Sequence, residues 1–163
     1  MSELIIREAC RLDAPVIWEI TQEAFREYEG IIVPPTRAVR ETVDDVREAL
    51  ARGGAALAFL GGDPVGVARY EWPCDGGKYL FLGRLAVRPP FRRQGIGRAL
   101  VAWVEQKAAS LGADEVRLGV YRIVARNLRY YESLGYRVYT HISRPGQHED
   151  IALLAKHLDA QVD

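Results

Sequence analysis

Apolar residues recur along the chain with two different periods, which separate predicted helices from predicted strands. Apolar positions three or four residues apart predict helices over 13–29, 43–52, 95–111 and 124–134. Short apolar or alternating runs between turn signals predict strands over 3–7, 55–60, 65–72, 79–87, 115–120, 136–143 and 151–156. We therefore expect an α+β fold, with a mixed, mostly antiparallel sheet of about seven strands flanked by about four helices.

Residues at the ends of the predicted segments support these boundaries. Asp13 can cap the first helix, with Pro15 in its first turn, and Thr42 can cap the second. Gly112 and Gly135 stand where the last two helices should end. No repeat, linker or low-complexity stretch interrupts the pattern, so residues 1–163 are expected to form a single domain.

The composition narrows the class of protein. Hydrophobic residues make up 48% and charged residues 27%, which is typical of a globular protein. Lys plus Arg and Asp plus Glu both total 22, and this balance argues against a nucleic-acid-binding protein. The sequence contains no apolar run long enough for a membrane span, and its N-terminus does not resemble a signal peptide. Cys10 and Cys74 are expected to be reduced thiols, and the predicted location is cytoplasmic.

The charge is unbalanced in one region. Between Gly76 and Val104 the chain has no acidic residue, and four arginines fall between 88 and 98, at the start of the clearest helix. A helix start carries partial positive charge and unpaired N–H groups, so it disfavours arginine unless an anion is bound. Gly95 and Gly97 would let that anion approach the backbone, and a diphosphate would suit the site. The alternative is a solvated basic turn.

The glycine pattern does not fit the common nucleotide-binding loops. In Gly95-Ile96-Gly97-Arg98-Ala99-Leu100, leucine stands where a dinucleotide fingerprint has its third glycine or alanine. The Gly-Lys-Ser/Thr ending of a Walker loop is also missing.

Two motifs resemble the GCN5-related N-acetyltransferase (GNAT) family. The stretch 85–97 is similar to its motif A, and the signature Arg/Gln-x-x-Gly-x-Gly/Ala is met by Arg92, Gly95 and Gly97. Tyr131-Glu132-Ser133-Leu134-Gly135-Tyr136 is similar to the end of motif B. The resemblance covers nearly the whole chain and implies a GNAT-like fold and an N-acetyltransferase that uses acetyl-CoA as its acetyl donor.

The resemblance also implies roles for particular residues. The end of the strand would offer backbone groups to the pantetheine arm, from Leu85, Ala86 and Val87. The loop and helix start would bind the pyrophosphate, through Arg92, Arg93, Gln94, Gly95, Ile96, Gly97 and Arg98. Asn127 and Tyr131 lie four residues apart on one helix, so both could face the thioester. Many family members have an asparagine at the position of Val124.

Tyr131 is the candidate general acid, because a tyrosine stays protonated at neutral pH and can donate to a departing thiolate. The alternative is a core aromatic residue. Many family members have a glutamate base on the central strand, whereas residues 81–84 contain no carboxylate. Glu71 and His141 are candidate replacements, and the amine could also lose its proton to water.

The acceptor is expected to be a primary amine of a small molecule or a peptide. By resemblance its pocket lies between 28–40 and 141–150, and the acidic residues there would suit a cationic amine, or are merely solvated. The three histidines are too scattered for a metal site, so no metal is predicted. No nucleic-acid or membrane partner is expected, although a homodimer is compatible with the family. A non-catalytic CoA-binding module is the alternative function.

Overall fold

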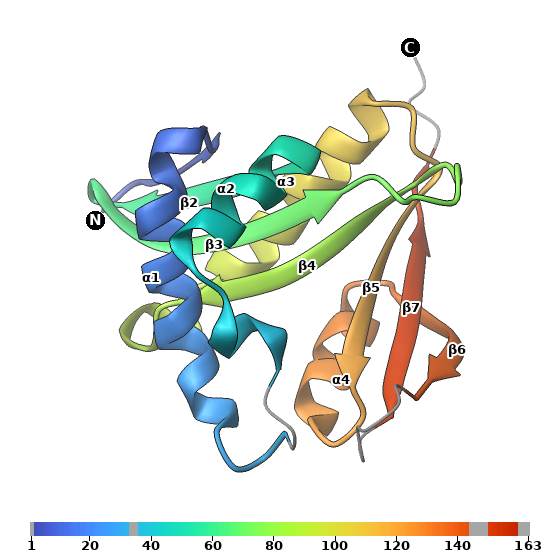
Figure 1. Cartoon of the computed structure of the whole chain (residues 1–163). Coiled ribbons are helices and arrows are strands. Elements are labelled where there is room, and N and C mark those ends of the chain that lie inside the picture. Colours follow the sequence, from blue (N-terminus) through green and yellow to red (C-terminus); the bar gives the residue numbers. More distant parts are fainter. Residues whose placement is uncertain (1, 33–35, 144–149, 160–163) are drawn as a thin grey trace.

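The sheet is continuous from one side of the molecule to the other. In this computed structural model, which describes residues 2–32, 36–143 and 150–159, seven strands pair in the order β1-β2-β3-β4-β5-β7-β6 (Figure 1). The strands are β1 (Leu4–Glu8), β2 (Gly53–Leu60), β3 (Asp63–Glu71), β4 (Tyr79–Val87), β5 (Glu115–Tyr121), β6 (Arg137–Ile142) and β7 (Ile151–His157). Only β4 and β5 are parallel neighbours. This confirms the predicted fold class.

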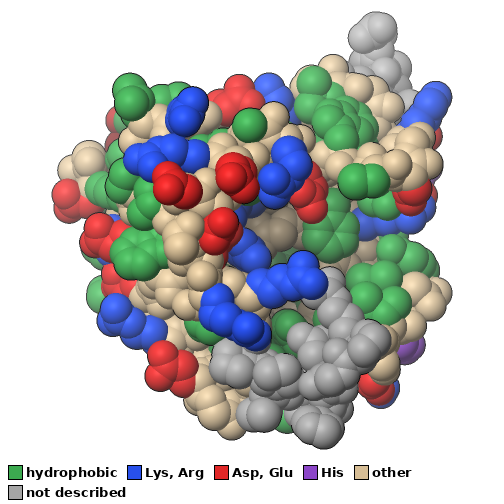
Figure 2. Space-filling model, viewed as in Figure 1, with side chains coloured by type: hydrophobic (Ala, Val, Ile, Leu, Met, Phe, Trp, Pro, Cys, Tyr) green, Lys and Arg blue, Asp and Glu red, His purple; other side chains and the backbone are tan. Residues whose placement is uncertain are grey.

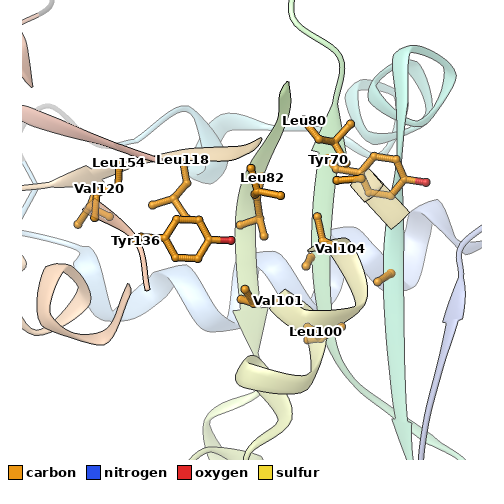
Figure 3. Packing of buried hydrophobic residues seen from close by; sticks show 14 of the residues in the cluster. Tyr70, Leu80, Leu82, Leu100, Val101, Val104, Leu118, Val120, Tyr136 and Leu154 are labelled. Carbon is orange, nitrogen blue, oxygen red and sulfur yellow. The ribbon is translucent and has the colours of Figure 1, made fainter. Parts of the chain in front are cut away.

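Helices cover both faces of the sheet. The α-helices are α1 (Ala14–Phe25), α2 (Val43–Arg52), α3 (Ile96–Ser110) and α4 (Ala125–Ser133). Short 3₁₀ turns add η1 (Arg11–Asp13), η2 (Arg26–Tyr28), η3 (Arg37–Arg40) and η4 (Pro89–Phe91). Because strand side chains alternate between faces, Leu57 packs with α1 and α2, while its neighbours Ala56 and Ala58 pack with α3 (Figure 3 shows the α3 side).

The sheet opens between β4 and β5. These two strands pair only from Tyr79 to Phe81, and beyond that point they diverge (Figure 1). β5 continues along β7, whereas β4 continues along β3. The β5-facing edge of β4 therefore has no strand beside it from Leu82 to Val87.

A β-bulge lies within this open part of β4. Gly83 pairs with Arg69 and Ala86 with Val67, so two residues of β4, Arg84 and Leu85, face the single residue between them on β3. Arg84 has a φ of 49°, a conformation that is uncommon for a residue other than glycine. A bulge bends its strand, and Arg84, like Arg69, lies on the face that α1 and α2 cover, where both bond to Glu41.

Two predictions about the first helix were wrong. The α-helix ends at Phe25 and continues only as the turn η2, and Asp13 makes no side-chain cap at its start. Asp13 has helical dihedral angles inside η1, so its carboxylate points back, accepting from the Cys10 N–H at 2.8 Å and from Arg7. Thr42 caps α2 as predicted, because its hydroxyl accepts from the Asp45 N–H at 3.1 Å.

Candidate functional site

The start of α3 offers a row of unpaired backbone donors. Gly95, the N-cap, has a φ of 80°, and Arg93 has a φ of 64°. The first backbone bond of the helix runs from the Ala99 N–H to the Gly95 carbonyl at 3.0 Å. Within the described chain, the N–H groups from Arg93 to Arg98 donate no hydrogen bond. Such a row at a helix N-terminus can bind phosphate oxygens.

Several residues of this row can offer an anion little more than their backbone. Gln94 and Gly95 are exposed, whereas the Ile96 side chain is buried in the core, so Ile96 can offer only its backbone. A Cβ on Gly97 would lie 3.0 Å from the hydroxyl of Tyr130. The site therefore fits the backbone-mediated anion binding expected of this loop.

The arginine cluster is less unbalanced than its local sequence suggests. Arg88 forms an ion pair with Glu23, and Arg92 pairs with Glu27. Both carboxylates come from α1 and η2, 65 residues away in sequence, and so they are invisible in a local count of charges. Of the four arginines between 88 and 98, only Arg93 and Arg98 have no ion pair with a described residue. Arg93 and Arg98, together with the row of unpaired N–H groups, are therefore the groups left to bind an anion.

The open edge of β4 borders a large cavity. Its volume is about 820 Å³, within the usual size range of ligand sites. Leu85, Asn127 and Tyr131 line it, whereas Ala86 is buried against α1 and α2. Val87 packs on the opposite side, against the α3 core. None of the residues 92–98 lines the cavity, so the row of unpaired N–H groups and the cavity are separate regions at the two ends of one unpaired strand edge.

Tyr131 packs in the core and also faces the cavity. Its ring packs edge-to-face on Tyr130 and Tyr136, with centroids 5.3 and 5.9 Å apart, as expected of a core aromatic residue. It also lines the cavity, where its hydroxyl forms no hydrogen bond with a described residue. Burial raises the pKa of this hydroxyl well above its ordinary value, with smaller contributions from Tyr130 and Tyr28. Tyr131 therefore holds its proton at neutral pH.

Asn127 is bonded to Tyr28, the first residue of the predicted acceptor segment 28–40, and the sequence gave no sign of this contact. Its Nδ2 donates to the Tyr28 hydroxyl at 2.9 Å, and beside this bond Arg126 pairs with Glu27 at 3.0 Å. Together the two contacts join η2 to α4 across the opening between β4 and β5. Tyr28 lines the cavity as well. Its position depends on where the first helix ends, which periodicity did not predict.

The candidate bases lie in different places. Glu71 is exposed at the end of β3, opposite Phe81, and it lines the cavity. His141 lies on β6 and is not among the lining residues. His148 and Glu149, in the second predicted acceptor loop, lie outside the described residues.

Within the described part of the chain, no cluster of three or more His, Cys, Asp or Glu side chains could hold a metal ion. Over the same residues, no helix has both the length and the apolar character needed to cross a bilayer.

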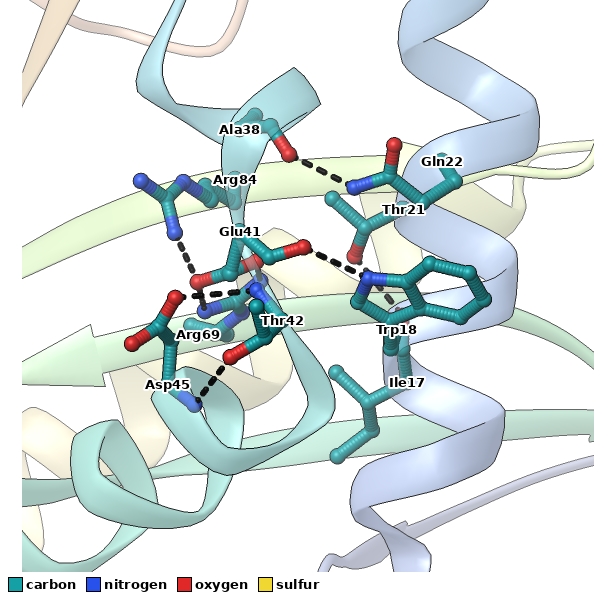
Figure 4. A network of polar contacts seen from close by, with 10 residues as sticks. All are labelled: Ile17, Trp18, Thr21, Gln22, Ala38, Glu41, Thr42, Asp45, Arg69 and Arg84. Carbon is teal, nitrogen blue, oxygen red and sulfur yellow. Dashed lines mark hydrogen bonds and ion pairs between the residues drawn. The ribbon is translucent and has the colours of Figure 1, made fainter.

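Sequence reasoning missed a buried ionic network at the cavity wall. Glu41, between η3 and α2, accepts hydrogen bonds from Arg69 of β3 and Arg84 of β4 (Figure 4). The Trp18 Nε1–H donates to the Glu41 carbonyl at 2.7 Å, which fixes this segment against α1. The available signals were Arg84, the one charged residue of the segment 79–87, and Arg69 in the segment 65–72. Figure 2 shows basic side chains around a hollow on this face.

Comparisons with known proteins agree on one family. Residues 16–136 match the acetyltransferase (GNAT) family. YvbK, an uncharacterized N-acetyltransferase of Bacillus subtilis (strain 168), is 30% identical over 95 residues, which are 58% of this chain. The match spans 60% of YvbK's own length.

Solved structures share the fold. The PaiA N-acetyltransferase of Thermoplasma acidophilum, in complex with coenzyme A, superposes with a TM-score of 0.79 at 19% identity, covering 95% of this chain and 99% of that one. YncA of Salmonella typhimurium, with its cofactor acetyl-CoA, gives a TM-score of 0.75 at 20% identity, covering 98% and 96%. The ribosomal-protein-S18-alanine N-acetyltransferase of Escherichia coli gives 0.75 at 20% identity, covering 99% and 97%.

A family match over residues 16–136 takes in the open edge of β4, the row of unpaired N–H groups and Tyr131, and the overall fold agrees with it. The chain belongs to the acetyltransferase (GNAT) family.

Proposed function

We propose that this protein is an N-acetyltransferase that moves an acetyl group from acetyl-CoA directly to a primary amine of a small molecule or a peptide. The observation that carries the proposal is an alignment of three features along β4. Unpaired N–H groups begin at Arg93, an unpaired strand edge precedes them, and the cavity with Tyr131 lies at the far end of that edge. A diphosphate, an extended amide-bearing arm and an acyl thioester occur in this order in acetyl-CoA.

The residues that would hold acetyl-CoA follow from this alignment. Backbone N–H groups of the loop and helix start, with the Arg93 and Arg98 side chains, would bind the pyrophosphate. The backbone of Leu85, Ala86 and Val87 would pair with the pantetheine arm as an added strand does. When bound, acetyl-CoA supplies an acetyl group already activated as a thioester.

The chain itself would position the amine and manage two protons. The cavity holds the acceptor beside the end of β4 and limits its access to water. The amine must be unprotonated to attack, and its proton leaves to water or to Glu71, the one candidate base that lines the cavity. The protonated Tyr131 hydroxyl, unpaired within the described chain, would donate to the sulfur as it departs. The products are an amide and a free thiol.

Binding and turnover test the proposal separately. Acetyl-CoA at about a hundred times its dissociation constant should stabilise the fold by roughly 2.7 kcal/mol, read as a rise in melting temperature. A screen of amines with acetyl-CoA, following the released thiol, should then find an acceptor. The absence of any thermal shift would count against the cofactor, and binding without turnover would instead indicate a non-catalytic CoA-binding module.

Tyr131→Phe tests the acid. Because the ring packing is kept and only the hydroxyl is lost, turnover should fall by about 10²-fold or more while acetyl-CoA affinity stays within about threefold. Tyr139→Phe is the matched control, since Tyr139 is exposed on β6 outside the cavity. Equal turnover in the wild type and Tyr131→Phe would remove Tyr131 from the mechanism.

A further inference from the structure

The ionic network at the cavity wall carries one positive charge more than its own carboxylate can balance. Glu41 is the only carboxylate bonded to Arg69 and Arg84 among the described residues. The exposed fractions of the three side chains are 5% for Glu41, 9% for Arg69 and 30% for Arg84. Arg84 is the most exposed of the three, and only its Nη1 forms a hydrogen bond with a described residue. Two guanidiniums around one carboxylate leave a net positive charge in a poorly hydrated place.

The other charged groups of the cavity do not cancel this charge. Besides the network, the lining contains three more arginines and three more acids: Arg37, Arg40, Arg52, Asp45, Glu48 and Glu71. Asp45 accepts from the Thr42 N–H in the cap of α2. Burial lowers the pKa of Arg84, Glu41 raises it, and Arg69 and Arg37 lower it further, while Asp45 is a second carboxylate within electrostatic reach of Arg84. Over all the charged residues that line the cavity, five arginines stand against four acids, which leaves an excess of one positive charge.

Two buried donors in the same wall have no partner. The Thr36 hydroxyl and the Nε–H of Arg69 are both fully enclosed, and neither forms a hydrogen bond in the described structure. Both residues are 7% exposed and line the cavity. Buried polar groups are nearly always paired, so this wall is short of hydrogen-bond acceptors as well as of negative charge. The two enclosed donors cannot reach a ligand themselves, and the groups of this wall that can are the partly exposed Arg84 and the exposed Arg37.

We propose that the acceptor amine carries an oxyanion, such as the carboxylate of an amino acid, and that Arg84 and Arg37 bind this oxyanion. This inference rests on the proposed acetyl transfer and names its substrate class. Arg84 directly precedes Leu85, at the cavity end of the open edge. An oxyanion bound by Arg84 would therefore suit a substrate in which only a few bonds separate the oxyanion from the amine that attacks the thioester.

A cationic acceptor fits the described wall poorly. Of the described acidic residues that the sequence offered for a cation, Glu27 pairs with Arg92 and Arg126, and Asp150 accepts from Ser143 and pairs with Arg122. Glu29 has no such partner in the described chain, but it does not line the cavity. The structure thus favours the opposite charge from the one that the loop composition suggested.

Matched acceptor pairs test the inference. With full-length protein and acetyl-CoA, kcat/KM is compared for α-amino acids and their primary amides, and for O-phosphoethanolamine and ethanolamine, with putrescine as a cationic amine. We expect at least about tenfold preference for one class of oxyanion, consistent with hydrogen bonds between charged groups. The amide's amine loses its proton more readily than the acid's, so preference for the acid cannot come from amine basicity. The two pairs distinguish carboxylate from phosphate.

Variants locate the anion. Arg84→Gln keeps the Arg69–Glu41 pair, and Arg37→Gln changes an exposed turn residue without an ion pair among the described residues, so at least the latter should fold normally. Either change should reduce the oxyanion preference about tenfold. Arg137→Gln is the control, because Arg137 is exposed on β6 and lines no part of the cavity.

Different results would overturn the oxyanion site and the proposed acetyl transfer. Turnover that favours putrescine or the neutral partners, or a preference unchanged in both arginine variants, would overturn the inference while leaving the enzyme in place. If no acceptor is turned over, calorimetry of N-acetylated amino acids and their amides with CoA-loaded or unloaded protein still decides it. Equal binding of acid and amide refutes the oxyanion site, whereas selective binding of the acid supports it.

Discussion

Replacing Glu41 by glutamine removes the negative charge shared by two guanidinium groups. The Glu41 and Arg69 side chains are 5% and 9% exposed, so Arg69 cannot turn to solvent after the change (Figure 4). Breaking a buried ion pair costs about 3–5 kcal/mol, because the remaining charge is left uncompensated. Arg84 is 30% exposed and can regain water, so we expect the lower limit, about 3 kcal/mol. For a domain of this size the melting temperature should fall by about 6–12 °C.

Urea unfolding followed by tryptophan fluorescence measures this loss, since Trp18 contacts the same segment. The slope with urea should stay constant while the midpoint falls. Glu48→Gln is the control: Glu48 lines the same cavity but is exposed on α2, so its removal should change stability by no more than about 0.5 kcal/mol. A loss below about 1 kcal/mol for Glu41→Gln would refute the assignment of a buried, mutually dependent network.

Three further predictions concern other parts of the molecule. Gly97→Val places a Cβ 3.0 Å from the Tyr130 hydroxyl, beside the row of unpaired N–H groups at the start of α3. The acetyl-CoA dissociation constant measured by calorimetry should rise about tenfold, and an unchanged constant would contradict binding of the pyrophosphate there. The hydrogen bonds from Arg7 lower the pKa of Asp13 from 3.8 to about 2, so its contribution is present above about pH 4 and lost as the pH falls towards 2. Because Arg7 is 46% exposed, Asp13→Asn should cost only about 1 kcal/mol at pH 7 and nothing near pH 2, by urea unfolding at each pH. Leu100→Ala empties a fully buried position and should cost about 3 kcal/mol by the same method, a loss under 1 kcal/mol being contrary to its core position.

Features that depend on neighbouring residues were predicted well from the sequence. The helix 43–52 and the strand 79–87 match the structure at both ends, because a capping box fixes one and turn and proline residues bound the other. The glycine loop before α3 was predicted to expose N–H groups, and in the described chain these groups are unpaired. Such features need only the local dihedral angles and a few side chains.

Features that depend on residues far apart could not be read from the sequence. The partners of Arg88 and Arg92 lie 65 residues away, and the end of α1 that brings Tyr28 to Asn127 is set by packing across the opening. The divergence of β4 from β5 leaves no mark on either strand alone, because the two look like ordinary apolar strands.

The sequence by itself thus determined most of the elements, the family resemblance and the row of unpaired N–H groups before α3, since local dihedral preferences and glycine spacing encode them. Only the tertiary structure decided the charge around the cavity. Coulomb energy depends on distance in space and on burial, and folding brings Glu41 to Arg69 and Arg84 while it takes Glu27 to Arg92.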